Sequence, residues 1–585
     1  VSSYSWSESS LRLVRAGAGG SLGMLLIRGG TGIGTGLPVL AEGPAARNLQ
    51  DRMGSHPGGS RKVIGLLNTN CSLCHGKPAS RTDADQDVVS DIGNDHWILQ
   101  DELLTWEKMD YHHQAFATLL TEQSQQIAKL LGVVDSEGNS IVHRDRRCLS
   151  CHSSMPVDQM ALKGDLVQEE TQRNPRYTIG VSCEACHGPA GKRADGAEGW
   201  GAAHSKPHDQ DDPSTTWRAL SPQTKFDEFG YWDVHSPRTQ ARICLSCHVG
   251  NAEQQKVITH EMYAAGHPPL PSFEQSQFIQ QMPRHWRRLD EKNERVRNQY
   301  LKQLEQLHPG DKSIPVYDPE EVAVTKATMI AALVALEDSM QLTADLIEGS
   351  STDTQWPEFA NYACFACHHE LQRDGWRKQH RITSTPGRPT LHEWPLTLSR
   401  VVAASLNNGD SSDLFIELNA VINALNARPY GDLQGLKKAT TSLAKVAELH
   451  SRKLSSTPIH REQALQFLNQ IAQAASTDLV DYDSARQFFW AYERTDAQLF
   501  SSNREGDNPL FEDVASVVML RLNKNRESIA PVQMYVGAAP LQPKRPQFAV
   551  RFDNTLRTVS DYDPKAVHAT FEKLRNRSLS DGRKK

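Results

Sequence analysis

The stretch Cys244-Leu-Ser-Cys247-His248 decides the fold of this chain, because its pattern of two cysteines followed by a histidine occurs five times. The other stretches are Cys71-Ser-Leu-Cys74-His75, Cys148-Leu-Ser-Cys151-His152, Cys183-Glu-Ala-Cys186-His187 and Cys364-Phe-Ala-Cys367-His368. The chain contains ten cysteines, and the five stretches use all of them. Because every cysteine of the chain belongs to such a stretch, the repeated pattern is not accidental.

A Cys-x-x-Cys-His stretch is an attachment site for a c-type haem. The two thiols bond to the vinyl groups of one porphyrin, and the histidine supplies the proximal nitrogen to iron. The sequence therefore predicts five covalently attached haem c groups. Their predicted proximal iron ligands are His75, His152, His187, His248 and His368.

Two other uses of cysteine explain the pattern less well. An even number of cysteines allows a disulfide framework, but disulfides give no reason for a histidine after every second cysteine. Paired Cys-x-x-Cys units can also form tetrahedral zinc sites. Five units would leave one unpaired, and the histidines would again be unexplained.

Composition narrows the class of protein further. The chain has 585 residues, of which 38% are hydrophobic, and a formal net charge of -6. This length allows more than one domain, and the mildly acidic balance does not indicate nucleic-acid binding. No run of 18 apolar residues occurs, so we expect no membrane span in the mature chain.

The first 45 residues are compatible with an export signal and a linker. Arg12 and Arg15 precede a weakly apolar stretch at 22–27, and Pro38-Val-Leu-Ala41 offers a small-residue cleavage site. A disordered tail is the alternative interpretation. Because c-type haem is attached outside the bacterial cytoplasm, the haem prediction favours a periplasmic or otherwise exported protein.

The chain divides into four predicted parts, and we expect a mainly α fold with long irregular loops, in which haems form much of the core. After residues 1–45, residues 60–275 form a four-haem domain, residues 276–395 a helical insertion with the fifth motif, and residues 396–585 a helical domain with a disordered tail from Ser578. Helical spacing is found at 101–131, at 276–306 with a break at Pro283, and at 319–348, 395–406, 413–427, 434–450, 461–475 and 483–500.

Three stretches carry a resemblance to a known family. They are Trp106-Glu-Lys-Met-Asp-Tyr-His112-His-Gln-Ala-Phe116, Val181-Ser-Cys-Glu-Ala-Cys-His-Gly-Pro189 and Ile258-Thr-His260-Glu-Met-Tyr-Ala-Ala-Gly-His267-Pro268. Over about residues 65–275 the chain resembles the tetrahaem cytochrome c of nitrifying bacteria and its multihaem relatives. The fifth motif and the helical C-terminal region lie beyond this resemblance.

The resemblance implies that His112, His204 and His267 bind iron on the distal side of the haems. It also implies an open distal position at the haem of Cys148, Cys151 and His152. His208 competes with His204 for its role, and His260 is a further distal candidate. A haem with two histidine ligands is suited to electron transfer, whereas an open position allows a small molecule to bind.

The function favoured by the sequence is electron transfer between redox protein partners, whose identity the sequence does not reveal. No catalytic residue is predicted. The alternative is an oxidoreductase that acts on hydroxylamine, nitrite or nitric oxide at one five-coordinate haem. The absence of a Cys-x-x-Cys-Lys motif counts against the second interpretation, because lysine ligation marks the related pentahaem nitrite reductases.

Overall fold

The computed structural model describes residues 71, 75–76, 99–155, 160–172, 177–191, 197–205, 216–311, 313–349, 356–368, 387–406, 412–477, 481–500 and 563–582. These residues are mainly helical, which confirms the predicted fold class. The predictions for the first 45 residues, for Cys74 and for His208 lie outside the described residues.

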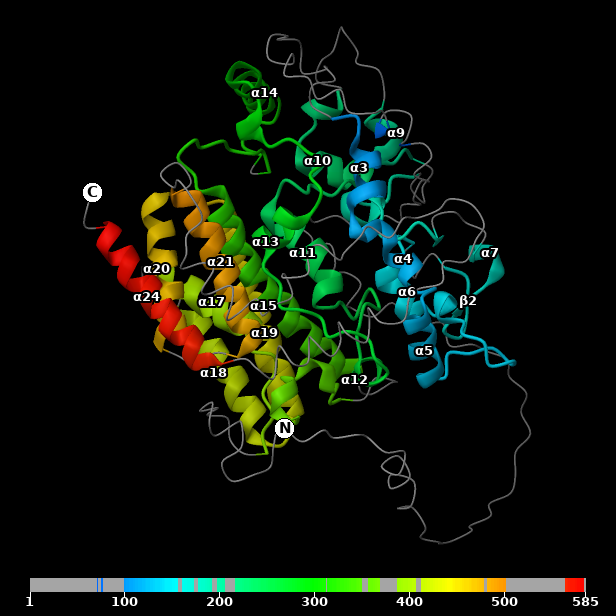
Figure 1. Ribbon diagram of the computed structural model, residues 1–585. Helices are drawn as coiled ribbons and strands as arrows, with labels where there is room; N and C mark the ends of the chain where they lie inside the picture. Colours follow the sequence, from blue (N-terminus) through cyan, green and yellow to red (C-terminus); the bar gives the residue numbers. More distant parts are fainter. Residues whose placement is uncertain are drawn as a thin grey trace. The chain divides into compact units, whose positions relative to one another are not determined.

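Short helices joined by turns form the region around the first four motifs (Figure 1). Its α-helices are α3 (Glu102–Met109), α4 (Ala115–Thr118), α5 (Glu122–Leu130), α6 (Arg146–His152), α7 (Glu169–Gln172), α8 (Cys183–His187), α9 (Trp200–Ala203), α10 (Pro222–Phe229), α11 (Pro237–His248) and α12 (His260–Ala264). One antiparallel hairpin pairs β1 (Leu162–Lys163) with β2 (Leu166–Val167), in the register Leu162↔Val167.

The single helix expected over 101–131 is instead three α-helices and a 3₁₀ turn (Tyr111–Gln114). The Asp110 side chain accepts a hydrogen bond from the His112 backbone N–H, and Thr121 accepts one from Ser124. Each side chain starts a new helix by satisfying an orphan backbone donor. The predicted end is confirmed at Gly132, which has φ +72°.

Longer helices make up the rest of the chain, and they confirm the helical segments expected from the sequence. Residues 276–306 contain α13 (Gln275–Gln281) and α14 (Glu294–Leu307), separated near Pro283 as predicted. The remaining helices are α15 (Ala323–Gly349), α17 (Trp394–Ser405), α18 (Ser412–Ala427), α19 (Leu433–Ser455), α20 (Arg461–Thr477), α21 (Tyr482–Phe500) and α24 (Pro564–Gly582). Helix α24 extends past Ser578, where the sequence predicts a disordered tail.

We call α15, α17, α18, α19, α20, α21 and α24 the helical body. Helix α15 packs along α19, α18 packs on α19, and α20 packs on α24 and α21 (Figure 1). One hydrophobic cluster runs through these helices, and it also contains Ala241 and Leu245 of α11. The helix of the fourth motif therefore shares a core with the helical body, across the boundaries expected near 275 and 395.

A second, much smaller cluster lies in the region of the first motifs and includes Phe116, Leu149 and Tyr177. Side chains thus bury far less apolar surface around the motifs than in the helical body. Within the described residues, no helix combines the length and apolar character that a membrane span requires.

Candidate haem-binding sites

The first motif places His75 opposite His204. Their imidazole centroids are 6.2 Å apart, and the ring planes differ by 23°. Nδ1 of His75 is 2.9 Å from a carboxylate oxygen of Glu102, and Nδ1 of His204 is 2.9 Å from the carbonyl oxygen of Trp200. Both rings therefore keep Nε2 available.

The fifth motif has the same arrangement. His368 and His260 have ring centroids 6.1 Å apart and planes that differ by 20°. The backbone N–H of His260 donates to Glu358, at 2.7 Å, and so ties the start of α12 to the segment that leads into the motif. His260 is thus placed opposite a proximal histidine that lies about a hundred residues away in sequence.

Both separations fit two imidazoles bound to one iron. A metal–imidazole bond of about 2.0 Å, plus about 1.1 Å from nitrogen to ring centre, gives a centroid separation of about 6.2 Å across a metal. These residues therefore fit the covalent haem c that the sequence predicts.

The second and fourth motifs each have one distal candidate nearby. Burial lowers the pKa of His267, and the charge of His152 lowers it further. Burial likewise lowers the pKa of His248, with a further contribution from His112. The structure thus brings His267 towards the second motif and His112 towards the fourth.

Aromatic side chains surround the histidine of the third motif. The ring of His187 lies 5.9 Å from Tyr231 and 6.3 Å from Trp200, measured between centroids. Burial, together with the charges of His285 and His235, lowers the pKa of His187 to about 3. The sequence did not single out His235 or His285 as ligands.

Several histidines fall into two classes, according to which ring nitrogen forms a hydrogen bond. The first class uses Nδ1 and leaves Nε2 for a metal; it contains His75, His112, His152, His204, His235, His267 and His285. The second class uses Nε2 in contacts within the protein; it contains His308, His392, His450 and His460. A hydrogen bond at one nitrogen fixes the tautomer and orients the other towards iron.

The pKa values agree with a ligand role for the buried rings. Burial lowers the pKa of His152 and of His204, which keeps these imidazoles neutral at pH 7. Only the neutral ring can donate a lone pair to iron. His75 and His112 differ, because a hydrogen bond to Glu102 raises the pKa of His75 and a hydrogen bond to Asp110 raises the pKa of His112.

The cysteines show which motifs are neighbours. None of the nine described cysteines forms a disulfide. The thiols of Cys71 and Cys183 interact, as do those of Cys151 and Cys247. The first motif therefore adjoins the third, and the second adjoins the fourth.

The fifth motif is the most exposed of the described motifs, because both Cys364 and Cys367 face solvent. Its position at the surface distinguishes it from the third motif, in which Cys186 is partly buried and burial raises the thiol pKa to about 12. Among the residues that can be described, no group of three or more His, Cys, Asp or Glu is arranged to hold a metal ion.

A close backbone contact connects the third motif to the distal candidate His112. The Val181 N–H donates to the carbonyl oxygen of His112 at 3.0 Å, and the Trp106 indole donates to the Val181 carbonyl at the same distance. Gly180 allows this approach: it has φ +73°, and a Cβ there would lie 2.4 Å from the His113 carbonyl oxygen. A side chain at position 180 would separate the two segments.

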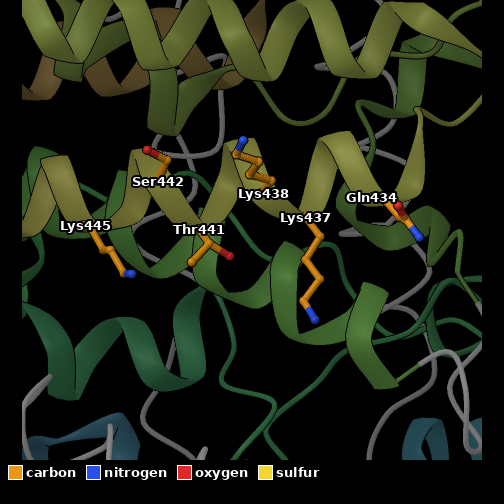
Figure 2. A pocket seen from close by; sticks show the side chains of 6 residues that line it. All are labelled: Gln434, Lys437, Lys438, Thr441, Ser442 and Lys445. Carbon is orange, nitrogen blue, oxygen red and sulfur yellow. The ribbon is translucent and has the colours of Figure 1, made fainter.

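A hollow on the surface of α19 lies apart from these sites. Figure 2 shows its lining side chains, which are Gln434, Lys437, Lys438, Thr441, Ser442 and Lys445. The lining contains no cysteine and no histidine, so this hollow is not part of any Cys-x-x-Cys-His motif.

Comparison with known proteins supports the interpretation of the motifs as haem attachment sites. Residues 96–188 match the family model described as cytochrome c554 and c-prime. No curated protein and no solved structure shows a significant match to the chain. The matched segment contains the second and third motifs and His112, and it supports a multihaem cytochrome c with covalent haem c and a role in electron transfer.

Proposed function

We propose that this chain is an exported pentahaem c-type cytochrome that transfers electrons between redox protein partners, mostly through haems with two histidine ligands. The observation that carries the proposal is the pair of imidazole separations, 6.2 Å for His75 and His204 and 6.1 Å for His368 and His260. Covalent haem c supplies an iron that accepts and donates single electrons. The protein positions these irons and sets their potentials.

The distal ligands proposed are His204 for the first haem, His267 for the second, His112 for the fourth and His260 for the fifth. For the third haem, His235 and His285 are the two candidates, because both influence the pKa of His187. Ligation by two histidines gives lower potentials than ligation by histidine and methionine.

Carboxylates orient several of these ligands. Glu102 accepts from Nδ1 of His75 at 2.9 Å, and Asp110 accepts from Nδ1 of His112 at the same distance. A hydrogen bond of this kind raises the basicity of the metal-binding nitrogen and holds the ring plane. Both carboxylates therefore favour the oxidised, more positive iron.

The order of the motifs in space supports a continuous path for electrons. The thiol contacts pair the first motif with the third and the second with the fourth. The segment from His260 to His267 approaches both the second and the fifth motif, so it joins the fifth haem to the others. Because the fifth motif is exposed, we place the docking position of a redox partner there.

The alternative is an oxidoreductase that acts on hydroxylamine, nitrite or nitric oxide at one five-coordinate haem. The family resemblance implies the open position at the haem of Cys148, Cys151 and His152, but His267 is proposed above as the distal ligand of that haem. We therefore place the five-coordinate haem of this alternative at the third motif.

The ring of Tyr231 lies 5.9 Å from that of His187, and the Tyr231 N–H donates to the carbonyl oxygen of Lys225 at 3.0 Å. Partial burial lowers the pKa of Lys225 to about 8. Such a lysine is a proton donor close to neutral pH.

Two measurements test the proposal. The mass of the mature protein and a haem stain after denaturing electrophoresis should show five covalently bound haems. Reduced protein treated with carbon monoxide should keep its visible spectrum if all irons are six-coordinate. A spectral change in the wild-type protein would favour the oxidoreductase.

A variant assigns the distal ligand of the fifth haem. His260→Ala should open one iron, so that reduced protein binds one carbon monoxide per chain. His392→Ala is the matched control, because Nε2 of His392 bonds to the carbonyl oxygen of Ala360 at 2.9 Å. If His260→Ala binds no more carbon monoxide than the control, His260 is not an iron ligand.

A further inference from the structure

The helix of the fourth motif, α11, has two faces with different chemistry. Arg238, Arg242 and Leu245 are spaced by four and three residues, so they share one face, whereas Cys244 and His248 project from another. Both arginines are 5% exposed and point towards the helical body. Helix α11 thus carries a haem motif on one face and two buried arginines on another. Apolar packing alone does not explain why these arginines are buried.

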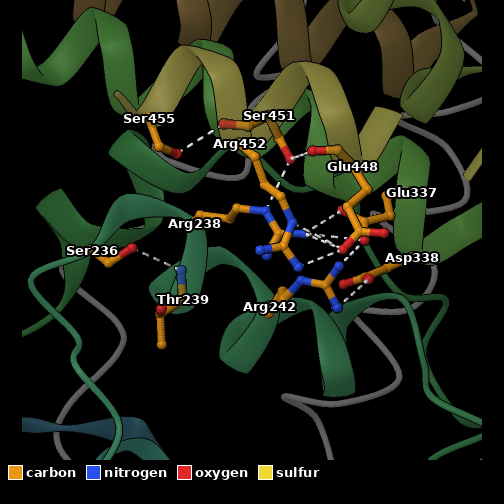
Figure 3. A network of polar contacts seen from close by, with 10 residues as sticks. All are labelled: Ser236, Arg238, Thr239, Arg242, Glu337, Asp338, Glu448, Ser451, Arg452 and Ser455. Carbon is orange, nitrogen blue, oxygen red and sulfur yellow. Dashed lines mark hydrogen bonds and ion pairs between the residues drawn. The ribbon is translucent and has the colours of Figure 1, made fainter. Parts of the chain in front are cut away.

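The buried arginines belong to a network that joins three helices (Figure 3). Arg238 reaches Glu337 of α15 at 3.1 Å and Glu448 of α19 at 3.6 Å, and its Nε donates to Ser451 at 3.0 Å. Arg242 forms an ion pair with Glu337.

The network is balanced in charge. Arg242 also lies 3.8 Å from Asp338, and Glu448 pairs with Arg452 at 2.7 Å. Three arginines, 238, 242 and 452, thus face three carboxylates, 337, 338 and 448. Burial lowers the pKa of Arg238 to about 10, so its guanidinium stays charged at neutral pH.

Stability alone does not account for this arrangement. Desolvation of buried ions offsets most of their attraction, and apolar residues of similar size often serve equally well. The surrounding cluster, with Leu245, Leu336 and Leu443, already provides apolar packing at this position. The charges are also close to the haem site, since Arg242 precedes His248 by six residues, about 9 Å along the helix axis.

Building on the function proposed above, we infer that Arg238, Arg242, Glu337 and Glu448 are positioning residues that set the reduction potential of the fourth haem. The arginines hold α11 against the helical body and place positive charge near the iron, while the carboxylates compensate that charge. Electron uptake by the haem is favoured when positive charge is in excess. The helical body then has a redox role although it contributes no ligand to the fourth haem.

The inference predicts potential shifts of opposite sign. Glu337→Gln leaves excess positive charge and should raise the potential of one haem, whereas Arg242→Gln should lower it. For unit charges about 12 Å apart at an effective dielectric constant of about 20, the reduction equilibrium changes about tenfold. That corresponds to about 59 mV for one electron. Arg242→Lys keeps the charge and should restore most of the wild-type potential.

The measurement is a spectroelectrochemical titration of the full-length, haem-loaded protein, with thermal unfolding recorded on the same samples. Glu448→Gln is a milder variant at the partly exposed edge of the network, and it should also raise the potential if Glu337→Gln does not fold. Glu462→Gln, on the exposed surface of α20, is the control and should shift no potential.

Unchanged potentials in folded variants, or shifts of the same sign for Glu448→Gln and Arg242→Gln, would overturn the inference. A mass lacking five haems in the wild-type protein would instead contradict the proposed function. The two failures are therefore distinguishable. A purely structural network would lower the unfolding temperature in both types of variant without the opposite shifts in potential.

Discussion

The region of the first four motifs and the helical body use different means to form a core. The helical body buries side chains continuously: along α15 the residues from Met329 to Leu336 are all at most 3% exposed. Around the motifs the side-chain cluster is small, and many elements are single helical turns. A region that binds several large cofactors can replace side chains by porphyrin, whereas a region without cofactors needs periodic apolar helices.

The largest expected effect comes from withholding the cofactors. We expect a chain produced without haem attachment to lose amide protection over 102–191, because the small cluster there cannot offset chain entropy. The helices between 323 and 500 should keep protection, since their core consists of side chains. Hydrogen exchange with mass spectrometry measures both regions in one sample. Equal protection in the two regions would remove the distinction between them.

A smaller effect is expected from a cavity in the helical body. Phe467 of α20 is fully buried, so Phe467→Ala should reduce the free energy of unfolding by about 3–5 kcal/mol. The visible spectrum should remain that of the wild-type protein, because no haem ligand lies on α20. Leu449→Ala, at a position 64% exposed, is the control and should change stability by less than about 0.5 kcal/mol. A changed visible spectrum in Phe467→Ala would mean that the two regions do not differ as described.

The smallest effect concerns pH. Burial, followed by the charge of Asp481, raises the pKa of Glu393 to about 7, and Arg400 opposes this. The folded state holds the proton more tightly than the unfolded state, so the stabilisation is complete below about pH 4.5 and is lost as the pH rises through 7.

We therefore expect the wild-type protein to lose about 1–3 kcal/mol from this group between pH 5 and pH 8. Glu393→Gln cannot ionise and should show a flatter dependence in denaturant unfolding at the two pH values. Parallel curves for the variant and the wild-type protein would show that Glu393 does not titrate in this range.

Much of the helical body follows from sequence periodicity. The segments expected at 319–348 and between 395 and 500 are all present with small changes at their ends. Around the motifs the same reasoning gave one helix where the structure has several, since Asp110 and Thr121 cap new helices. Side-chain capping competes with periodicity most effectively in short segments with few apolar contacts.

The sequence by itself determined the five cysteine–histidine motifs, and with them the predicted cofactor and proximal ligands, because covalent haem attachment requires residues that are adjacent in the chain. Only the tertiary structure brought His204 to His75 and His260 to His368, and only it placed Arg238 and Arg242 against Glu337. These partners lie on separate segments. Their contacts depend on how the helices pack, and local sequence patterns do not record that packing.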